Sequence, residues 1–229
     1  GQDGKEFSRN YQQTIKHWAR LMWTKNPLIK RAVYTQTSYV FGQGINIEAE
    51  DERVNEVIQE FLDDKKNRTE LTEHQARMTK ETELQLFGNL FFVFFVNKAT
   101  GQVRVRTLPS NEITDVITNP DDAKEPWYYR RDYVEQEFLD KWGTRRSKHK
   151  TVYYPDWRVY NPRKFVGGEP VEDAFVYHVS VNKLSDQKFG TSEVYSALDW
   201  AKAYNRFLED WATIVRAHSK FAWRIVTKG

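Results

Sequence analysis

The sequence predicts an α+β fold with N-terminal helices, antiparallel strands and hairpins in the middle, and one long C-terminal helix. Apolar residues recur at helical spacing as far as Gly88, and from Asn89 their period changes to that of strands. Helical spacing returns after Thr191. Helices and antiparallel strands in separate stretches of the chain are typical of α+β proteins. The three expected parts are residues 1–88, 89–182 and 183–229.

The first part is expected to contain four helices. Asn26-Pro27 is an N-cap followed by a first-turn proline, so a second helix begins there and ends near Gly42 and Gly44. Ile45 and Ile47 alternate with polar residues and predict a short strand. A third helix is expected from near Asp51, and a fourth from around Thr69–Thr72 to Leu86, where Gly88 ends it. The apolar faces of the first and third helices are Tyr11, Ile15, Trp18 and Met22, and Val54, Val57, Ile58, Phe61 and Leu62.

The middle part is expected to form strands. Leu90–Val96 is continuously apolar, which is typical of a strand covered on both faces. Asn97–Gly101 supplies a hairpin turn, and Val103–Thr107 alternates as the returning strand. Further strands are predicted at Ile113–Thr118, Tyr128–Val134, Thr151–Tyr154 and Phe175–Val181.

In the last part, Thr191 or Ser192 is expected to cap a helix that reaches about Lys220 and spans roughly 40 Å at about 1.5 Å per residue. A further strand is expected after this helix. The helix has apolar residues on more than one face, so its aromatic residues are either packing residues or contacts between subunits. These are Trp200, Tyr204, Phe207 and Trp211, with Trp223 after the helix.

Composition excludes several classes of protein. The 229 residues include no cysteine, which rules out disulfides, thiolate metal sites and cysteine nucleophiles, and fits an intracellular protein. The longest apolar run, Leu90–Val96, is too short to span a bilayer, so no membrane partner is expected. The chain has no signal-peptide core and no initiator methionine, which suggests a processed or trimmed piece of a longer protein.

The small net charge of +3 conceals a strong asymmetry along the chain. Residues 48–86 hold 12 acidic and 6 basic residues, a net of −6, and residues 141–164 have a net charge of +7. Such asymmetry is typical of contact surfaces. The basic stretch also contains tryptophans and tyrosines, so it could bind nucleic acid or form a solvated surface loop. Its candidate DNA- or subunit-contact residues are Arg145, Arg146, Lys148, Lys150, Arg158, Arg163 and Lys164.

No catalytic, cofactor-binding or metal-binding motif stands out, and no enzyme activity or cofactor is expected. The five histidines are far apart in sequence and are expected at the surface or its boundary: His17, His74, His149, His178 and His218. Pro155-Asp156 followed by Asp186-Gln187-Lys188 matches the loose PD…(D/E)xK pattern of metal-dependent nucleases. Asp186 and Lys188 are expected in a polar connector rather than on a core strand, which favours a chance match.

The succession of motifs resembles the portal proteins, or head-to-tail connectors, of tailed bacteriophages. The matching pieces are Asn26–Arg31, Tyr39–Ile45, Gly88-Asn89 before an apolar hairpin, Leu108–Ile113, Tyr177-His178, and Phe189–Ser192 before the long helix. The resemblance covers nearly the whole chain and is to the N-terminal wing of a portal subunit. The family's stem, clip and crown cannot be located after Gly229, so a fragment is expected.

This resemblance implies a non-enzymatic assembly protein of the virion. Portal subunits form a ring, usually dodecameric, at one capsid vertex, and are assembled in the cytoplasm of the bacterial host. Double-stranded DNA is packaged and ejected through the ring, and the terminase large subunit, the capsid and the neck proteins contact it. The alternatives are a PD…(D/E)xK-like nuclease and a non-specific DNA-binding module.

Overall fold

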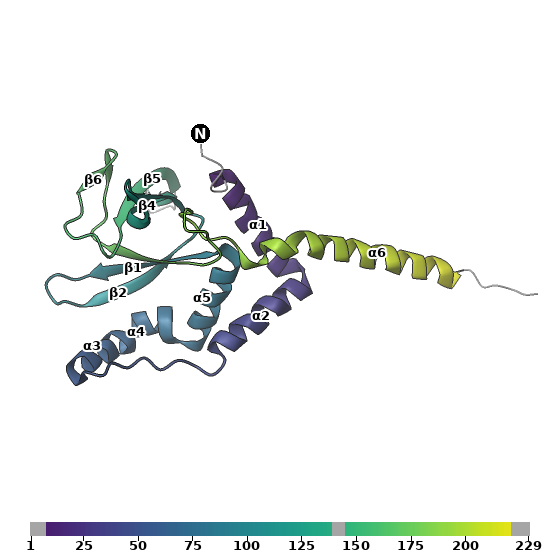
Figure 1. Cartoon of the computed structure of the whole chain (residues 1–229), viewed down its shortest axis with the longest axis horizontal. Coiled ribbons are helices and arrows are strands. Elements are labelled where there is room, and N and C mark those ends of the chain that lie inside the picture. Colours follow the sequence, from purple (N-terminus) through teal and green to yellow (C-terminus); the bar gives the residue numbers. More distant parts are fainter. Residues whose placement is uncertain (1–7, 139–144, 221–229) are drawn as a thin grey trace, which may run out of the picture.

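A computed structural model describes residues 8–138 and 145–220 (Figure 1). The chain is a mixed α+β protein with antiparallel sheets and a long C-terminal helix, so the predicted fold class is confirmed. Helices α1, α2 and α5 lie beside the sheets, and α6 extends away from the body (Figure 1). Among the described residues, no helix combines the length and the apolar character needed to cross a membrane.

Two capped helices begin the described chain. Helix α1 covers Arg9–Lys25, and α2 covers Pro27–Phe41. The side chain of Asn26 accepts hydrogen bonds from the backbone N–H groups of Leu28 and Ile29, at 2.9 and 3.1 Å. The predicted cap and first-turn proline are therefore confirmed, because this geometry satisfies two amide groups at the helix start.

The predicted strand at Ile45 and Ile47 is wrong. This segment lies against no neighbouring strand, and its backbone is held by side chains instead. Gln59 Nε2 donates to the Ile47 carbonyl oxygen at 2.8 Å, and the Ala49 N–H donates to Asn55 Oδ1 at 3.1 Å. Two alternating isoleucines do not suffice to form a strand when no partner strand is present to bond with the backbone N–H and C=O groups.

The predicted third helix is confirmed as α3, Glu52–Asp63, with Asp51 as its N-cap. The predicted fourth helix is confirmed as α5, His74–Phe87, which ends before Gly88 as expected but begins two residues after the predicted start around Thr69–Thr72. The short helix α4, Lys65–Asn67, and a π-helical turn, Arg68–Thr72, precede it.

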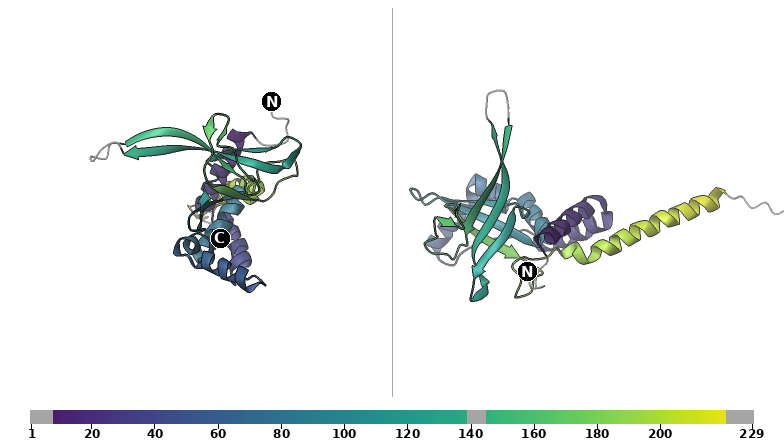
Figure 2. Two further views of the ribbon diagram at one scale, coloured as in Figure 1. Left: turned by 90° about the vertical axis from the view of Figure 1, so that its left-hand side faces the viewer. Right: turned by 90° about the horizontal axis from the view of Figure 1, so that it is seen from above.

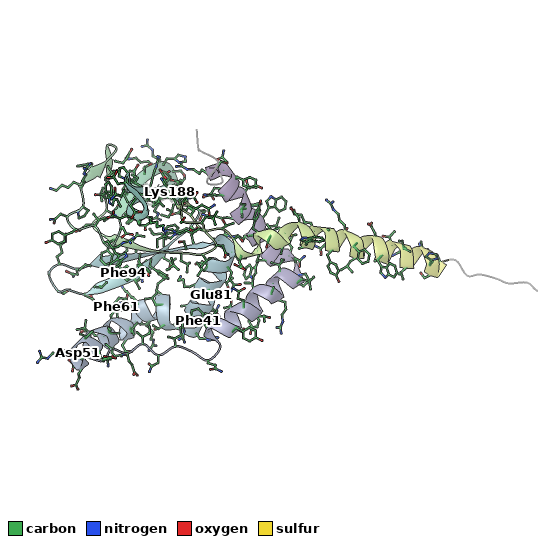
Figure 3. The ribbon with its side chains drawn as sticks, viewed as in Figure 1. Phe41, Asp51, Phe61, Glu81, Phe94 and Lys188 are labelled. Atoms are coloured by element: carbon green, nitrogen blue, oxygen red, sulfur yellow. The ribbon has the colours of Figure 1, made fainter. Side chains whose placement is uncertain are left out.

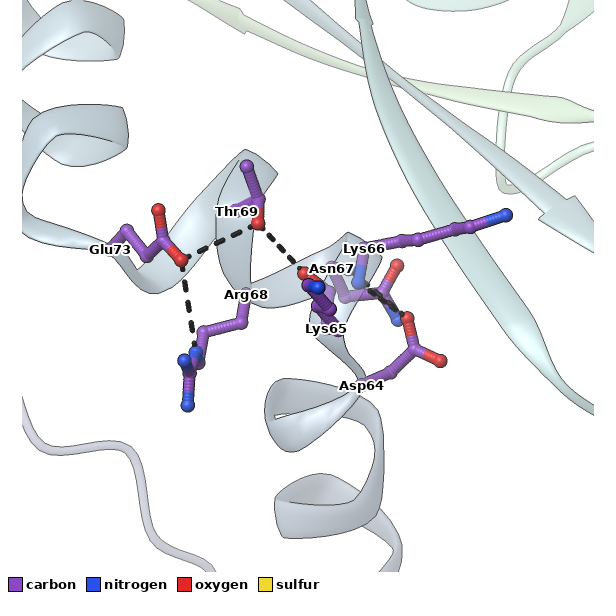
Figure 4. Close-up of polar contacts among 7 residues, drawn as sticks. All are labelled: Asp64, Lys65, Lys66, Asn67, Arg68, Thr69 and Glu73. Carbon is purple, nitrogen blue, oxygen red and sulfur yellow. Dashed lines mark hydrogen bonds and ion pairs between the residues drawn. The ribbon is translucent and has the colours of Figure 1, made fainter.

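The polar side chains in Figure 4 explain this interruption. Asp64 accepts from the backbone of Lys66 and Asn67 and so caps α4. The Asn67 side chain is itself buried and bonds to Val103 and Val105 of the first sheet. These bonds fix the chain against that sheet before α5 begins.

The first sheet has the strand order β2-β1-β8 and is antiparallel. Its strands are β1, Asn89–Val96; β2, Val103–Leu108; and β8, Phe175–Ser180. Phe91 and Val93 of β1 are fully buried on one face, and Leu90 is buried on the other. The expected cover on both faces thus holds for the first half of β1, whereas Phe95 and Val96 are exposed.

The second sheet has the order β3-β4-β5, with β3 at Ile113–Asn119, β4 at Asp122–Phe138 and β5 at Arg145–Pro155. Strands β4 and β5 extend well beyond the predicted strands and form a long two-stranded ribbon that projects from the body (Figure 2). A small hairpin of β6, Phe165–Val166, and β7, Glu169–Pro170, was not predicted.

Two hydrophobic clusters hold the molecule together. One lies between the two larger sheets and includes Phe91, Tyr129 and Val176. The other joins α1, α2 and α5 to the base of α6, through residues such as Val33, Leu86 and Leu198. The second cluster contains residues of both the first and the last of the three parts expected from the sequence, because the chain returns to the N-terminal helices after β8.

Candidate subunit-contact surfaces and the joint beside them

Helix α6, Leu198–Lys220, is the most exposed large element of the molecule. A 3₁₀ turn, Glu193–Ala197, leads into it. The predicted cap is only partly correct, since Ser192 precedes this turn and its hydroxyl donates to the Gln85 carbonyl oxygen rather than capping the helix. Only Leu198 and Ala201 of α6 are buried, and most of the helix extends beyond the other described elements (Figures 1 and 3).

The large apolar residues of α6 from Trp200 to Val215 lie on one side of the helix, which corrects the expectation of apolar residues on more than one face. At about 100° per residue, its apolar residues fall within about half of the circumference, and the charged residues occupy the other half. Phe207 and Trp211 stack with their ring centroids 6.4 Å apart. An uncovered apolar face of this extent is typical of a contact surface between proteins. Its exposed members are Trp200, Tyr204, Phe207, Leu208, Trp211, Ile214 and Val215.

The β4–β5 ribbon carries most of the predicted basic contact residues, but it also carries acids. Cross-strand pairing places Glu135 opposite Lys148 and Glu137 opposite Arg146. Lys150 Nζ lies 3.7 Å from a carboxylate oxygen of Glu135. Residues directly opposite each other share one face of a sheet. The net charge of the ribbon is therefore smaller than the count over residues 141–164 suggests.

The remaining candidate residues have different surroundings. Arg158 is engaged at the body, where its Nε donates to Asp156 Oδ1 at 2.8 Å. Arg163 and Lys164 are exposed on the loop before β6. Arg146 and Lys148 are exposed on β5, and the Arg145 side chain lies outside the described part. The structure thus gathers Arg146, Lys148 and Lys150 on one element and separates Arg158 from them.

The acidic stretch lies elsewhere on the molecule. Helix α3 and the segment before it expose most of its carboxylates, Glu56 and Glu60 among them. Helix α3 and the ribbon project from different sides of the body (Figure 2). Because the two charged regions do not face each other within one chain, each is free to contact another molecule.

Gly88-Asn89, His178 and Gly190, which belong to motifs of the portal resemblance, contact one another next to the base of α6. We call this set of contacts the joint. Asn89 is fully buried, and its Oδ1 accepts from the Gly190 N–H at 2.8 Å while its Nδ2 donates to the Gly190 carbonyl oxygen at 2.9 Å. His178 Nε2 lies 3.0 Å from the same Oδ1. Because that oxygen can only accept, the His178 nitrogen is the donor. The joint ties the start of β1 to the connector that leads into α6.

The two glycines of this joint allow the backbones to approach closely. Gly88 has φ of +70°, and a Cβ there would lie 2.5 Å from the Thr191 backbone. A Cβ on Gly190 would lie 2.1 Å from the Gly88 carbonyl oxygen. Only glycine fits at either position. The role of these motifs in the fold is therefore to join segments about a hundred residues apart.

His178 is half-buried, at the boundary as expected, and its ring packs against the core. Its ring stacks on Phe91 with centroids 4.2 Å apart and meets Tyr129 edge-on. Burial, with a smaller effect from Lys183 and Lys16, lowers the pKa of His178 to about 3. The histidine is thus neutral at physiological pH and belongs to the packing of the joint.

The nuclease pattern does not form a metal site. Asp156 accepts from the Tyr129 hydroxyl at 2.8 Å as well as from Arg158, so protein donors already occupy its oxygens. Burial and the neighbouring Asp156 raise the pKa of Tyr129, which therefore remains a donor. Asp186 and Lys188 lie in an irregular connector, as expected, and Lys188 Nζ lies 3.6 Å from Asp115. Within residues 8–138 and 145–220, no three histidine or carboxylate side chains are grouped to hold a metal ion.

No protein-family model matches the chain, and no curated protein matches it.

The sequence reasoning missed Lys16, which is buried on the inner face of α1. Its position between Ile15 and Ala19 carried the signal, because those residues lie on the buried stripe of the helix. A charged residue within an apolar stripe requires a specific partner or role.

Proposed function

We propose that this chain is a subunit of a bacteriophage portal ring. It would lie at one vertex of the capsid, with double-stranded DNA passing through the ring and with the terminase large subunit, the capsid and neck proteins as partners. Its role would be structural rather than catalytic. The order of the sequence motifs supports the family, and the exposed apolar face of α6 supports an assembling protein. That face is the observation on which the proposal depends.

A ring requires contact between two different surfaces of neighbouring subunits. In a two-fold dimer the same patch of each subunit faces its own copy. A head-to-tail contact instead joins two different patches and is repeated by rotation from subunit to subunit until the ring closes. The separation of the acidic α3 region from the basic ribbon favours the head-to-tail arrangement, since opposite charges on two subunits can then meet. Charge at the edge of such an interface governs association rate and register, and the apolar side chains of α6 supply most of the affinity.

The test is the oligomeric state of the protein expressed from its complete reading frame, measured by mass photometry and electron microscopy. We expect closed rings for the unaltered protein. Leu208→Glu combined with Val215→Glu places charge in the middle of the apolar face and should abolish the rings. Both residues are largely exposed in the single chain, so the body of the subunit should still fold.

Thr213→Glu is the matched control, because Thr213 lies on the polar side of the same helix and should tolerate the added charge. A protein that remains monomeric, or that stops at a two-fold dimer, would contradict the proposal. Rings that form equally well with Leu208→Glu and Val215→Glu would exclude α6 as the contact surface.

A further inference from the structure

A small cavity beside α1 is lined by cationic and neutral donor side chains and by no carboxylate. It has a volume of about 190 Å³ and is lined by Gln13, Lys16, His17, Arg20, Phe87 and Asn111. Three of its six lining residues can carry positive charge, and all three come from α1. A cavity with this lining is complementary to an anion.

Lys16 is the decisive residue, because its charge is buried and none of the described residues forms an ion pair with it. Its exposed fraction is 8%, and its Nζ donates to the Ser110 carbonyl oxygen at 2.7 Å. An ammonium group has three N–H donors, so this bond leaves capacity for a ligand. The cavity wall offers no carboxylate to neutralise it.

The surroundings of Lys16 make its uncompensated positive charge unfavourable. Burial lowers the pKa of Lys16 to about 8. Glu83, whose carboxylate interacts electrostatically with Arg20, lines a neighbouring cavity rather than this one. An anion beside Lys16 would restore the charged form that burial disfavours.

A second polar group, in the residue whose carbonyl oxygen binds Lys16, also has an unused bonding capacity. The Ser110 hydroxyl is buried, and none of the described residues forms a hydrogen bond with it. Ser110 lines the neighbouring cavity of about 310 Å³, which shares Arg20, Phe87 and Asn111 with the first but is also lined by the carboxylates of Glu70 and Glu83, so the anion is placed in the first cavity. A buried polar group without a partner is costly unless water or a ligand satisfies it.

We propose that this cavity binds a small oxyanion of the phosphate or sulfate class, with Lys16 as its main donor and with Arg20 and His17 at its edge. This site is separate from the apolar face of α6, and the proposal does not depend on ring assembly. A tetrahedral oxyanion offers several acceptors at once, which suits donors that converge from α1 and from the segment at Ser110 and Asn111.

Isothermal titration calorimetry with sodium sulfate, at constant ionic strength set by sodium chloride, tests the proposal. We expect saturable binding of one sulfate per chain. Lys16→Met keeps the length of the side chain without its charge and should weaken binding at least tenfold. Arg20→Gln, at an exposed position that folding tolerates, should weaken it several-fold. Lys25→Met, on the exposed last turn of the same helix, should have no effect.

The pH dependence distinguishes a role for Lys16 from general attraction by surface charge. Sulfate does not titrate in this range, so binding above pH 8 should take up a proton on Lys16, detected by comparing buffers of different ionisation enthalpy. The affinity for sulfate should then fall by up to about tenfold for each pH unit above pH 8. Lys16→Met should show no such proton uptake.

Displacement of sulfate by a short oligonucleotide would identify the ligand as a nucleic-acid phosphate, and displacement by inorganic phosphate alone would identify a free anion. Absence of saturable binding, or equal affinity in a folded Lys16→Met variant, would overturn the proposal.

Discussion

Asn89 and Gly190 bind each other through two hydrogen bonds, although 101 positions separate them in the sequence. Their contact joins the first strand of the sheet to the connector before α6. Asn89 pairs with Ser180 through the backbone of the sheet, while its side chain satisfies the backbone groups of Gly190, which belongs to no strand. It lies within the region where α5, β1, β8 and the start of the last helical segment meet.

Asn89→Ala should destabilise the protein strongly. The change leaves the Gly190 N–H and carbonyl groups and the His178 donor without their partner in a buried place, at a cost of about 2–4 kcal/mol. Chemical denaturation measures the free energy of unfolding. Asn10→Ala, at an exposed position on α1, should change it by less than about 0.5 kcal/mol. An effect of Asn89→Ala no larger than that of this control would show that the joint contributes little to stability.

His178 should make the protein sensitive to acid. The unfolded chain takes up a proton on this residue near pH 6.5, whereas the folded chain does so only near pH 3. The stability due to neutral His178 is therefore complete above pH 6.5 and is lost as pH falls towards 3, by on the order of 3 kcal/mol.

His178→Phe retains a ring next to Phe91 and cannot titrate, so its unfolding free energy should fall less steeply between pH 6.5 and 3. The comparison variant is His149→Gln on the exposed part of β5. Its pH dependence should match that of the unaltered protein. Parallel curves for His178→Phe and the unaltered protein would contradict the argument.

Any binding of DNA by the ribbon should be electrostatic and independent of sequence. Arg146→Gln with Lys148→Gln should reduce the slope of log affinity against log salt by up to about 2, at about 0.9 for each phosphate that the ribbon no longer neutralises. Glu135→Gln should strengthen binding, because this carboxylate competes for Lys148 and Lys150. Fluorescence anisotropy at several salt concentrations measures both effects. A strong preference for one sequence over scrambled DNA at equal salt would contradict this prediction.

Divalent metal ions should not activate DNA cleavage. Asp156 is already bonded to Tyr129 and Arg158, and Asp186 lies in an irregular connector. With supercoiled plasmid and Mg²⁺ or Mn²⁺, Asp156→Asn and Asp186→Asn should leave any trace nicking in the preparation unaltered. Cleavage by the purified protein that both variants abolish would identify a nuclease and exclude the structural role.

The sequence alone determined the class of the fold and most of its helices and strands. Periodicity and caps are local properties, so Asn26-Pro27, Asp51 and the Asn97–Gly101 turn predicted element ends that the structure confirms. The same local rules failed at Ile45 and Ile47, where the missing partner strand decided the outcome. They also placed the start of the fourth helix slightly early, because bonds from Asn67 to a distant strand hold the chain before His74.

Only the tertiary structure decided which residues become available for contact. Residues 141–164 are strongly basic in sequence, but strand pairing places Glu135 and Glu137 opposite some of their positive charges. The aromatic residues of α6 fit a buried core equally well in sequence, but the helix extends away from the body. Lys16 likewise became buried, and His178 half-buried, only when segments far apart in sequence packed around them. Burial and cross-strand pairing depend on which distant segments meet, so a local pattern such as the stripe around Lys16 can mark a buried face but cannot identify the segment that covers it.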